Sequence, residues 1–452
     1  MFVGADVLTS SAATHPPRRL RFITVLLLLP LMMLGSAFTR LALAPSEPRT
    51  TVTPVRGALR SADGTVLASG PLHDRRYPQG AVAGPVVGFV GTSAGLEGAE
   101  RAFDAALQRG EDVTLTLDAR VQDAVEEVLI QAVRRTSAQY ANAIVMDTRT
   151  GDLRAVATVP GFAPASWRTA PAGRWRNRAL LDEYEPGSVI KALTVAALLD
   201  AGLTTPETRY DTPMVRRVAR AAIHDIVPHP ARLSTREILR YSSNVGMTRL
   251  VEGVPAPQLR RAFAAFGLGR PVTLALPAGD GRVRDATAWT ELSQATMAFG
   301  QGLTVTTLQL AAAFNVLAAD GRYVTPRLTA AVPVRTRPVL APATAARMRE
   351  VLHGVIDDGI RGKAALPGYH VGGKTGTAQV VVSGRYSESV FSSTFAGFLP
   401  ADRPQFTVAV MVRGAQREYQ GSQVAAPIFR DISAALVSLY ALAPAPEDRK
   451  AH

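Results

Sequence analysis

Strand-like and helix-like segments are grouped along this chain of 452 residues and do not alternate. One hairpin pattern, ANAIVMDTRTGDLRAVATVP, covers residues 141–160, and three more strand patterns follow only from His370 onward. Helical patterns fill the region between them, and a last helical stretch, VAAPIFRDISAALVSLYAL, follows the strands. A parallel sheet needs a crossover, usually a helix, between successive strands. The order found here instead predicts an α+β fold in which helices flank an antiparallel sheet.

An uncharged, largely apolar run covers residues 22–39 and follows a cluster of three arginines. At about 1.5 Å per residue, a helix of this length nearly spans a bilayer core of about 30 Å. Basic residues beside such a helix favour the cytoplasmic side of the membrane. The pattern predicts a cytoplasmic tail at 1–21 and a single transmembrane anchor at 22–40, with the bulk of the chain outside the cytoplasmic membrane.

A cleaved signal peptide is the alternative interpretation, because Ala42-Leu43-Ala44 resembles a small-residue cleavage site. Pro45 follows that site directly, and the apolar run is long for a signal peptide, so an uncleaved anchor is favoured. In either case the residues that follow are exported.

The rest of the chain divides by composition. Residues after 54 are Gly-rich and carry short β-like runs, GTVLAS and AGPVVGFVG. Asp118 is placed to cap an amphipathic helix, DARVQDAVEEVLIQAVRR. We therefore predict a linker at 41–54, a small, mostly β module at 55–117, a main domain at 118–440 and a flexible tail at 441–452.

The basic residues exclude some partners and single out certain positions. The formal net charge is +13, but zinc-finger spacing, aromatic RNA-binding signatures and Lys/Arg blocks are absent, so we expect no nucleic-acid partner. Cys is absent too, which excludes disulfides and thiolate metal sites. Only four of the 50 basic residues are Lys: Lys191, Lys363, Lys374 and Lys450. Because burial can remove the proton from Lys but not from Arg, a Lys in this chain marks a candidate position for chemistry.

Ser188 and Lys191 lie three residues apart at the start of an apolar helix, directly after a break at Pro186-Gly187. This spacing places both side chains on one face of the first turn. A Ser hydroxyl needs an adjacent base to act as a nucleophile, and a Lys amine can be that base once burial lowers its pKa from about 10.4. Alone, the pair is better explained as a helix N-cap and a surface charge.

Ser242, Ser243 and Asn244 follow a helix that begins with a capping box, Ser234 to Glu237. A hydroxyl and an amide two residues apart on a turn can point into one cleft. There Ser242 can relay a proton, and Asn244 can hold a substrate carbonyl or the Lys amine. Alone, this segment is an ordinary polar turn.

The strand pattern GGKTGTA contains Lys374, Thr375, Gly376 and Thr377. Its glycines, which include Gly376, remove side chains and so allow a substrate backbone to approach. Lys374 and Thr375 can bind a carboxylate by charge and hydroxyl. The backbone N–H of Thr377, together with that of Ser188, can form an oxyanion hole. Alone, a glycine-rich edge strand would explain the pattern as well.

Ser-x-x-Lys, Ser-x-Asn and Lys-Thr-Gly occur here in the order known from β-lactamases and penicillin-binding proteins. The chain resembles a class B penicillin-binding protein, one of the monofunctional D,D-transpeptidases that cross-link peptidoglycan. The resemblance runs from about residue 55 to residue 437 and includes NRALLDEYEPGSVIK, FGQGLTVTTLQLAAAFNVLAADG and YQGSQVAAPIF. It departs from the family at the start of the N-terminal module, where RGALRSADG keeps little more than the turn.

The resemblance implies a role for each motif. Ser188 attacks the penultimate D-Ala carbonyl of a stem peptide, and Lys191 takes its proton. Ser242 relays that proton to the leaving amine, while Asn244 orients the donor peptide. The Lys-Thr-Gly motif holds the terminal carboxylate, or that of a penicillin, and no metal or other cofactor is needed.

The resemblance also implies partners and a location. Stem peptides and β-lactams are the expected ligands, the module at 55–117 is a dimerisation-like pedestal, and a polytopic glycosyltransferase is a possible partner. The catalytic domain lies on the outer, periplasmic side of the inner membrane, for division or elongation of the wall. A D,D-carboxypeptidase, a β-lactamase and a non-catalytic β-lactam sensor or scaffold on the same fold remain the alternatives.

Four other titratable residues near the motifs receive no catalytic role. His224 and His229, like the other His, lack the spacing of metal ligands and are interpreted as surface or loop residues. Glu183 and Glu185 precede Ser188 closely in the sequence but are expected to lie outside the chemistry.

Overall fold

A computed structural model of the chain describes residues 30, 32–40, 55–382 and 384–445. The chain separates into two compact units, Met1–Thr53 and Pro54–His452. In the first unit the described residues are helical, with exposed side chains. The predicted cytoplasmic tail and the predicted linker lie outside the described residues, as do residues 22–29 and 31 of the predicted anchor. Within the described ranges, no helix combines the length and apolar character needed to cross a bilayer.

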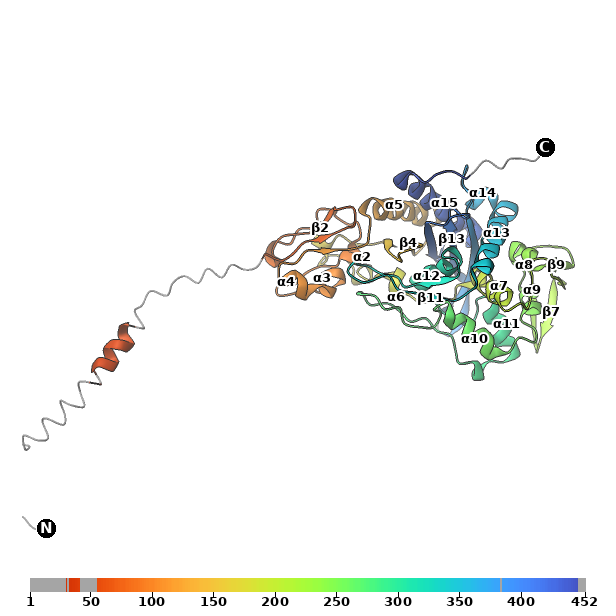
Figure 1. Cartoon of the computed structure of the whole chain (residues 1–452), viewed down its shortest axis with the longest axis horizontal. Coiled ribbons are helices and arrows are strands. Elements are labelled where there is room, and N and C mark those ends of the chain that lie inside the picture. Colours follow the sequence, from red (N-terminus) through yellow and green to blue (C-terminus); the bar gives the residue numbers. More distant parts are fainter. Residues whose placement is uncertain (1–29, 31, 41–54, 383, 446–452) are drawn as a thin grey trace, which may run out of the picture. The chain divides into compact units, whose positions relative to one another are not determined.

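The second unit is built on a five-stranded antiparallel sheet (Figure 1). Its strands, in spatial order, are β12 (Gly372–Val382), β13 (Arg385–Leu399), β14 (Phe406–Arg413), β4 (Tyr140–Asp147) and β5 (Leu153–Val159). β4, from the first hairpin of the sequence, therefore pairs with β14. This pairing joins segments that are separated by more than half of the chain. This arrangement confirms the predicted α+β fold with an antiparallel sheet.

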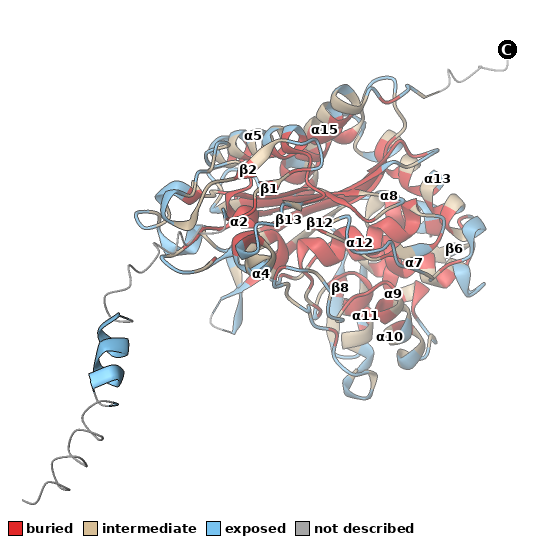
Figure 2. Ribbon diagram, turned by 60° about the vertical axis from the view of Figure 1, so that its left-hand side comes forward, coloured by how far each residue is buried: buried red, intermediate tan, exposed pale blue. Residues whose placement is uncertain are grey.

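Side chains of the sheet alternate between two hydrophobic cores. In β4, Ala143 and Val145 face one core, whereas Ile144 and Met146 face the other. This is the period of two expected for a strand that is covered on both faces. Figure 2 shows the strands buried between helices on either side.

One face of the sheet is covered by α5 (Ala119–Thr136) and α15 (Gly421–Tyr440), which also pack against each other. The carboxylate of Asp118 accepts a hydrogen bond from the backbone N–H of Arg120 and so caps α5. The predicted cap is therefore confirmed. A cap of this kind stabilises a helix by about 1 kcal/mol.

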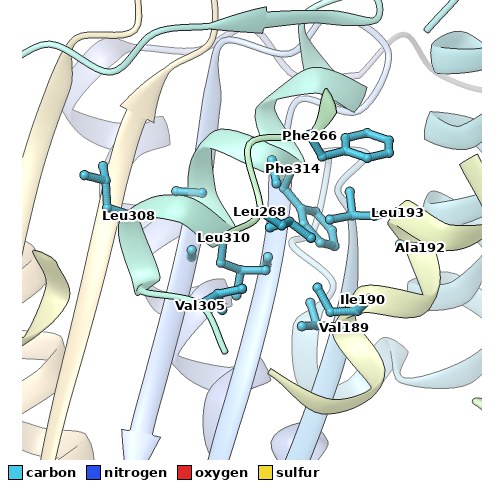
Figure 3. Packing of buried hydrophobic residues seen from close by; sticks show 14 of the residues in the cluster. Val189, Ile190, Ala192, Leu193, Phe266, Leu268, Val305, Leu308, Leu310 and Phe314 are labelled. Carbon is cyan, nitrogen blue, oxygen red and sulfur yellow. The ribbon is translucent and has the colours of Figure 1, made fainter. Parts of the chain in front are cut away.

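The other face is covered by α12 (Thr307–Ala318), which is buried along its whole length. Its apolar side chains meet those of η4 (Gly187–Ile190) and α7 (Lys191–Asp200) (Figure 3). Two buried polar groups of α12 are paired with the sheet. Thr307 donates to Asn142 Oδ1 at 2.6 Å, and Thr407 donates to Asn315 Oδ1 at 2.8 Å. These bonds fix the helix that supports η4.

Smaller elements complete the second unit around this core. The helices are η2 (Pro164–Ser166), η3 (Ala172–Arg174), α6 (Arg178–Leu181), α8 (Thr235–Tyr241), α9 (Asn244–Leu250), α10 (Ala256–Ala265), η5 (Ala286–Ala288), α11 (Glu291–Ala298), α13 (Pro342–Gly359) and α14 (Arg361–Ala364). Three two-stranded ribbons join β6 (Arg209–Asp211) with β9 (Arg232–Ser234), β7 (Val215–Val218) with β8 (Ala221–His224), and β10 (Arg322–Val324) with β11 (Thr336–Pro338).

The module at 55–117 is not mostly β, so that prediction is wrong. Its strands are short, β1 (Leu59–Arg60), β2 (Val66–Ala68) and β3 (Val113–Thr114), and more of it is helical: η1 (Leu72–Asp74), α2 (Gly84–Val87), α3 (Gly98–Ala102) and α4 (Asp104–Gln108). The run AGPVVGFVG, expected to be extended, contains α2. Pro85 presets a helical φ near the start of α2, and Gly88 ends it at φ +73°.

Candidate active site

All three sequence motifs meet at one cavity of about 260 Å³. Six of the eight predicted site residues line it: Ser188, Ser242, Asn244, Thr375, Gly376 and Thr377. The other two, Lys191 and Lys374, are 0% and 1% exposed and contact the lining residues from within the protein. Segments separated by more than 180 residues thus contribute to one site.

Ser188 lies in η4, which is pressed against β12. Gly187 before it has φ +63°, and a Cβ there would come within 2.5 Å of the Thr377 carbonyl oxygen. Only Gly satisfies both conditions. Thr394 on β13 also donates a hydrogen bond to the Pro186 carbonyl at 2.9 Å. These contacts place the backbone of Ser188 beside that of Thr377, as the predicted oxyanion hole requires.

The Lys191 amine is held by the Ser-x-Asn turn. Its Nζ donates to the Ser242 carbonyl, to Asn244 Oδ1 at 2.8 Å and to Ser242 Oγ at 3.3 Å. Burial lowers the pKa of Lys191 well below its usual value, and the nearby charge of Lys374 lowers this pKa further. A neutral amine keeps two N–H donors for these partners, and its lone pair is then free to accept a proton.

The Ser188 hydroxyl is half-buried and has no hydrogen-bond partner among the residues that the structure describes. It is therefore available to a ligand in the cavity. Hydrogen bonds between a nucleophile and its base are often long in the absence of substrate and tighten when substrate binds.

Ser242 has a strained backbone that turns the chain between two helices. It caps the C-terminus of α8 at φ +56°, and Ser243 then caps the N-terminus of α9 by accepting a hydrogen bond from the Gly246 N–H at 2.7 Å. A residue with a Cβ in the left-handed region costs roughly 1–2 kcal/mol. The capping box of α8, Ser234 with Glu237, is present as predicted.

Lys374 lies across the cavity on β12. Its Nζ donates to Ser242 Oγ at 3.1 Å and to Thr375 Oγ1 at 3.4 Å. Burial lowers the pKa of Lys374 to about 7. Ser242 Oγ therefore lies between the amines of Lys191 and Lys374, as a proton relay would require.

The glycines of β12 are required by the packing of the chain itself. A Cβ at Gly376 would come within 2.3 Å of both the Pro186 carbonyl oxygen and Thr394 Oγ1. A Cβ at Gly372 or Gly373 would collide with a Phe ring of β13. These glycines make room for the chain's own packing, so they are needed even when no substrate is bound.

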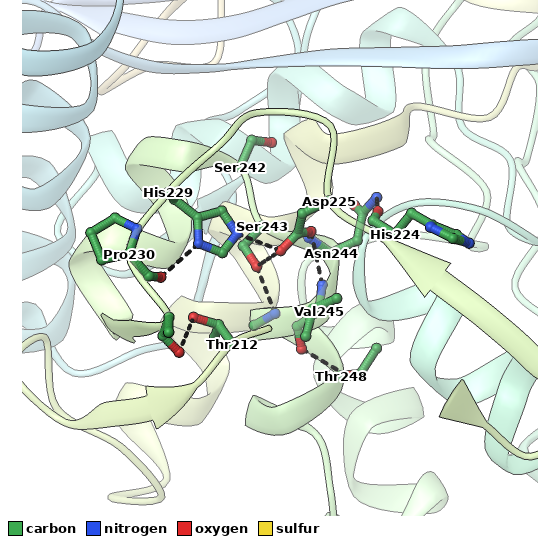
Figure 4. A network of polar contacts seen from close by, with 12 residues as sticks. Thr212, His224, Asp225, His229, Pro230, Ser242, Ser243, Asn244, Val245 and Thr248 are labelled. Carbon is green, nitrogen blue, oxygen red and sulfur yellow. Dashed lines mark hydrogen bonds and ion pairs between the residues drawn. The ribbon is translucent and has the colours of Figure 1, made fainter. Parts of the chain in front are cut away.

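Sequence reasoning missed two buried residues beside the cavity. The side chain of His229, interpreted as a surface or loop residue, is 0% exposed and lies 2.8 Å from the carboxylate of Asp225 (Figure 4). His229 does lie in a loop, as interpreted, but its ring is enclosed by its partners and does not lie at the surface. No spacing or periodicity marks this loop, so the sequence carries no local signal for the pair.

Glu185 and Glu183 support the cavity from outside it. Glu185 accepts hydrogen bonds from the Gly302 N–H and from the Tyr386 hydroxyl on β13. Glu183 accepts from the Gly281 N–H and the Thr304 hydroxyl. Within the described part of the chain, no group of His, Asp and Glu is arranged to hold a metal ion.

Several known proteins are similar to this chain in sequence and in fold. The model of the penicillin binding protein transpeptidase domain matches residues 141–434. A probable peptidoglycan D,D-transpeptidase, PenA of Neisseria flavescens, is 33% identical over 75% of this chain and 85% of its own length. Peptidoglycan D,D-transpeptidase FtsI of Escherichia coli K12 is 30% identical over 78% of this chain and 65% of its own length.

A solved structure shows the same architecture. Penicillin-binding protein 3 of Mycobacterium tuberculosis superimposes with a TM-score of 0.80 at 29% identity, covering 87% of this chain and 98% of that one. That relative has also been solved in complex with aztreonam and with ampicillin. The motifs, their convergence on one cavity and these similarities agree, and the chain belongs to the penicillin-binding protein transpeptidase family, with relatives of the class B type.

Proposed function

We propose that this chain is a penicillin-sensitive D,D-transpeptidase that cross-links peptidoglycan stem peptides through an acyl-enzyme on Ser188. One observation carries the proposal: Lys191 is buried, its pKa is lowered, and its amine is hydrogen-bonded to Ser242 and Asn244 next to the cavity that Ser188 lines. A base of this kind is what a Ser nucleophile needs.

Acylation begins when the neutral Lys191 amine accepts the Ser188 proton. Ser188 Oγ then forms a bond to the carbonyl carbon of the penultimate D-Ala, and the negative charge on the carbonyl oxygen is stabilised by the N–H groups of Ser188 and Thr377. The C–N bond to the terminal D-Ala breaks. Ser242 passes the proton from Lys191 to the leaving amine, a role supported by its distances of 3.3 Å from Lys191 and 3.1 Å from Lys374.

The acyl group then moves to a second stem peptide. The amine of that peptide attacks the ester carbon, its proton passes to Lys191, and the C–O bond to Ser188 breaks with return of a proton to Oγ. Every proton that leaves a reactant is accounted for by Lys191, so the cycle needs no metal or redox partner.

Lys374 and Thr375 bind the carboxylate of the substrate or of a β-lactam. The proposal is supported by the amine and hydroxyl that meet at this end of the cavity, with Lys374 Nζ 3.4 Å from Thr375 Oγ1. A carboxylate beside the Lys374 amine favours its protonated form. The aztreonam and ampicillin complexes of the relative support the inclusion of β-lactams among the ligands.

The chain is further proposed to act at the inner membrane. Residues 22–40 would anchor it, with 1–21 in the cytoplasm and 41–54 as the linker. Residues 55–117 would be the pedestal and 118–440 the catalytic domain on the periplasmic side, followed by the tail at 441–452. The apolar run behind three arginines supports this topology. A polytopic glycosyltransferase of the division or elongation type is the proposed partner of the pedestal.

Labelling with a fluorescent penicillin tests the nucleophile. The full-length protein should form a covalent adduct, and Ser188→Ala should form none. Ser389→Ala, which replaces an exposed Ser on β13, is the matched control and should label like wild type. An adduct on Ser188→Ala would remove Ser188 from the mechanism.

The acceptor is tested by following one donor peptide with and without an added amine. A transpeptidase yields a cross-linked product in proportion to the amine. Release of free acid alone would mean a D,D-carboxypeptidase, and turnover of the penicilloyl adduct within seconds would mean a β-lactamase. Labelled protein that processes neither peptide would be a sensor or scaffold.

A further inference from the structure

Asp225 and His229 lie in the loop between β8 and β9, next to the turn that carries the Ser-x-Asn motif. Both side chains are almost completely buried, Asp225 at 2% and His229 at 0% exposed. Neither lines the cavity, whereas Ser242 and Asn244 do. The proposed chemistry does not use this pair. A buried carboxylate is costly unless it is well paired, so its position calls for an explanation.

Asp225 binds the motif directly. One carboxylate oxygen accepts hydrogen bonds from the backbone N–H groups of Asn244 and Val245, and the other accepts from the Ser243 hydroxyl and faces His229 Nε2 at 2.8 Å. Figure 4 shows the carboxylate between the His229 ring on one side and the start of α9 on the other. Three consecutive residues of the motif region are thus tied to one side chain.

His229 fixes the orientation of that carboxylate. Its Nε2 contacts Asp225, and its Nδ1 lies 2.8 Å from the carbonyl oxygen of Pro230. Both neighbouring oxygens are acceptors, so rotation of the ring would lose at least one hydrogen bond from a ring N–H. Asn244 is also held by the end of β8, directly before this loop, since its side-chain amide donates to the His224 carbonyl at 3.1 Å.

The turn needs such support. Ser242 is held at φ +56°, a conformation that a residue with a Cβ adopts only when its surroundings impose it. The residues that follow Ser242 carry the hydrogen bonds to Asp225, and Asn244 in turn places its Oδ1 2.8 Å from Lys191 Nζ. The chain of contacts therefore runs from His229 through Asp225 and Asn244 to the base.

We propose that Asp225 and His229 are positioning residues that set the distances of Ser242 and Asn244 from the Lys191 amine, and so control the rate of Ser188 acylation. This proposal rests on the proposed function and deepens it. A displacement of about 1 Å near a reacting group can lower a rate by about 100-fold. The pair is therefore expected to act on the acylation step and not on initial binding.

Penicillin labelling of the full-length protein, followed over time, tests the proposal because amplitude and rate are separate readouts. Asp225→Ala is expected to lower the maximal acylation rate by about 100-fold and His229→Ala by about 10-fold, with less than about a threefold change in the half-saturating penicillin concentration. Asp225→Asn keeps an acceptor for the two backbone N–H groups. It should recover about a tenth or more of the wild-type rate.

Asp211→Asn is the matched control. Asp211 lies on β6 and is exposed, and its carboxylate pairs with the exposed Arg232, so this variant should acylate like wild type. If Asp225→Ala does not fold, Asp225→Asn and His229→Ala carry the test.

The outcomes separate the two proposals. If the Asp225 and His229 variants lose amplitude while the remaining sites react at the wild-type rate, or if they react like wild type throughout, the positioning role is overturned. Absence of labelling in the wild type and in Asp211→Asn would instead overturn the proposed function itself.

Discussion

The two walls of the cavity are held in place by different means. The sheet wall, residues 374–377, is fixed by backbone pairing between β12 and β13 and by close backbone contacts such as the one at Gly376. The helical wall, residues 242–244, is fixed by side chains, chiefly the carboxylate of Asp225. Substitutions in the sheet wall should therefore disturb folding and catalysis together. Substitutions in the helical wall should change rates while the fold persists.

Adding a methyl group at Gly376 should displace the strand that forms the sheet wall. Gly376→Ala brings a methyl group within 2.3 Å of the Pro186 carbonyl and Thr394 Oγ1. We expect penicillin acylation to fall by more than about 100-fold, and the free energy of unfolding to fall by about 1–3 kcal/mol. Labelling rates and urea unfolding measure the two effects.

Gly362→Ala is the control for this substitution, since no heavy atom lies within 4 Å of a Cβ there. It should leave both quantities near wild type. Normal acylation by Gly376→Ala would show that the sheet wall tolerates displacement.

Removing one side chain from the helical wall should lower the acylation rate without unfolding the protein. Asn244→Ala deletes the hydrogen bond of 2.8 Å to the Lys191 amine. The loss of about 2 kcal/mol corresponds to an acylation rate lower by about 30-fold. The free energy of unfolding should change by less than about 1 kcal/mol. A fall in stability as large as that of Gly376→Ala would contradict the proposed difference between the walls.

The charge of Lys374 on the sheet wall should make penicillin acylation depend on pH. Lys374 has a pKa of about 7 and binds a carboxylate only when protonated, so capture weakens as pH rises through this value. We expect the second-order rate constant for penicillin acylation to fall by about 10-fold between pH 6 and pH 8.

Lys374→Arg keeps its charge over this range and should show no such decline, although the different shape of Arg should lower its activity at every pH. The same decline in Lys374→Arg would assign the titration to another group.

The smallest effect is expected at the tip of the loop that carries Asp225. Ile226 lines the cavity but is 84% exposed, so it contributes little buried surface. Ile226→Ser should change the acylation rate by less than about threefold and the stability by less than about 0.5 kcal/mol. A larger loss would mean that the helical wall depends on this apolar side chain as well as on Asp225.

Local rules in the sequence predicted local features. The hairpin at 141–160 became β4 and β5, Asp118 capped α5, and Ser234 with Glu237 formed the capping box of α8. Each of these depends on residues only a few positions apart. The three motifs were found because their order was known from a family, and the structure brings their residues to one cavity.

Contacts between segments that lie far apart in the sequence could not be predicted from such local rules. Asp225 meets Ser243 and His229 from an irregular loop, where neither helical nor strand periodicity applies. The apolar run at Gly84–Val87 formed a helix because Pro85 and Gly88 outweighed its β-prone valines. The glycines of β12 were explained only by an approaching substrate, and the need for them that arises from their neighbours across the sheet and in η4 was not foreseen.

Of the three Lys residues that the structure describes, one is exposed to amine-reactive reagents. Lys363 in α14 is exposed, whereas Lys191 and Lys374 are 0% and 1% exposed. A bulky reagent of this kind therefore reaches Lys363 and leaves both cavity amines unmodified. A fluorophore or a surface tether can be attached there, and binding and acylation can then be followed optically on a protein whose catalytic amines are intact.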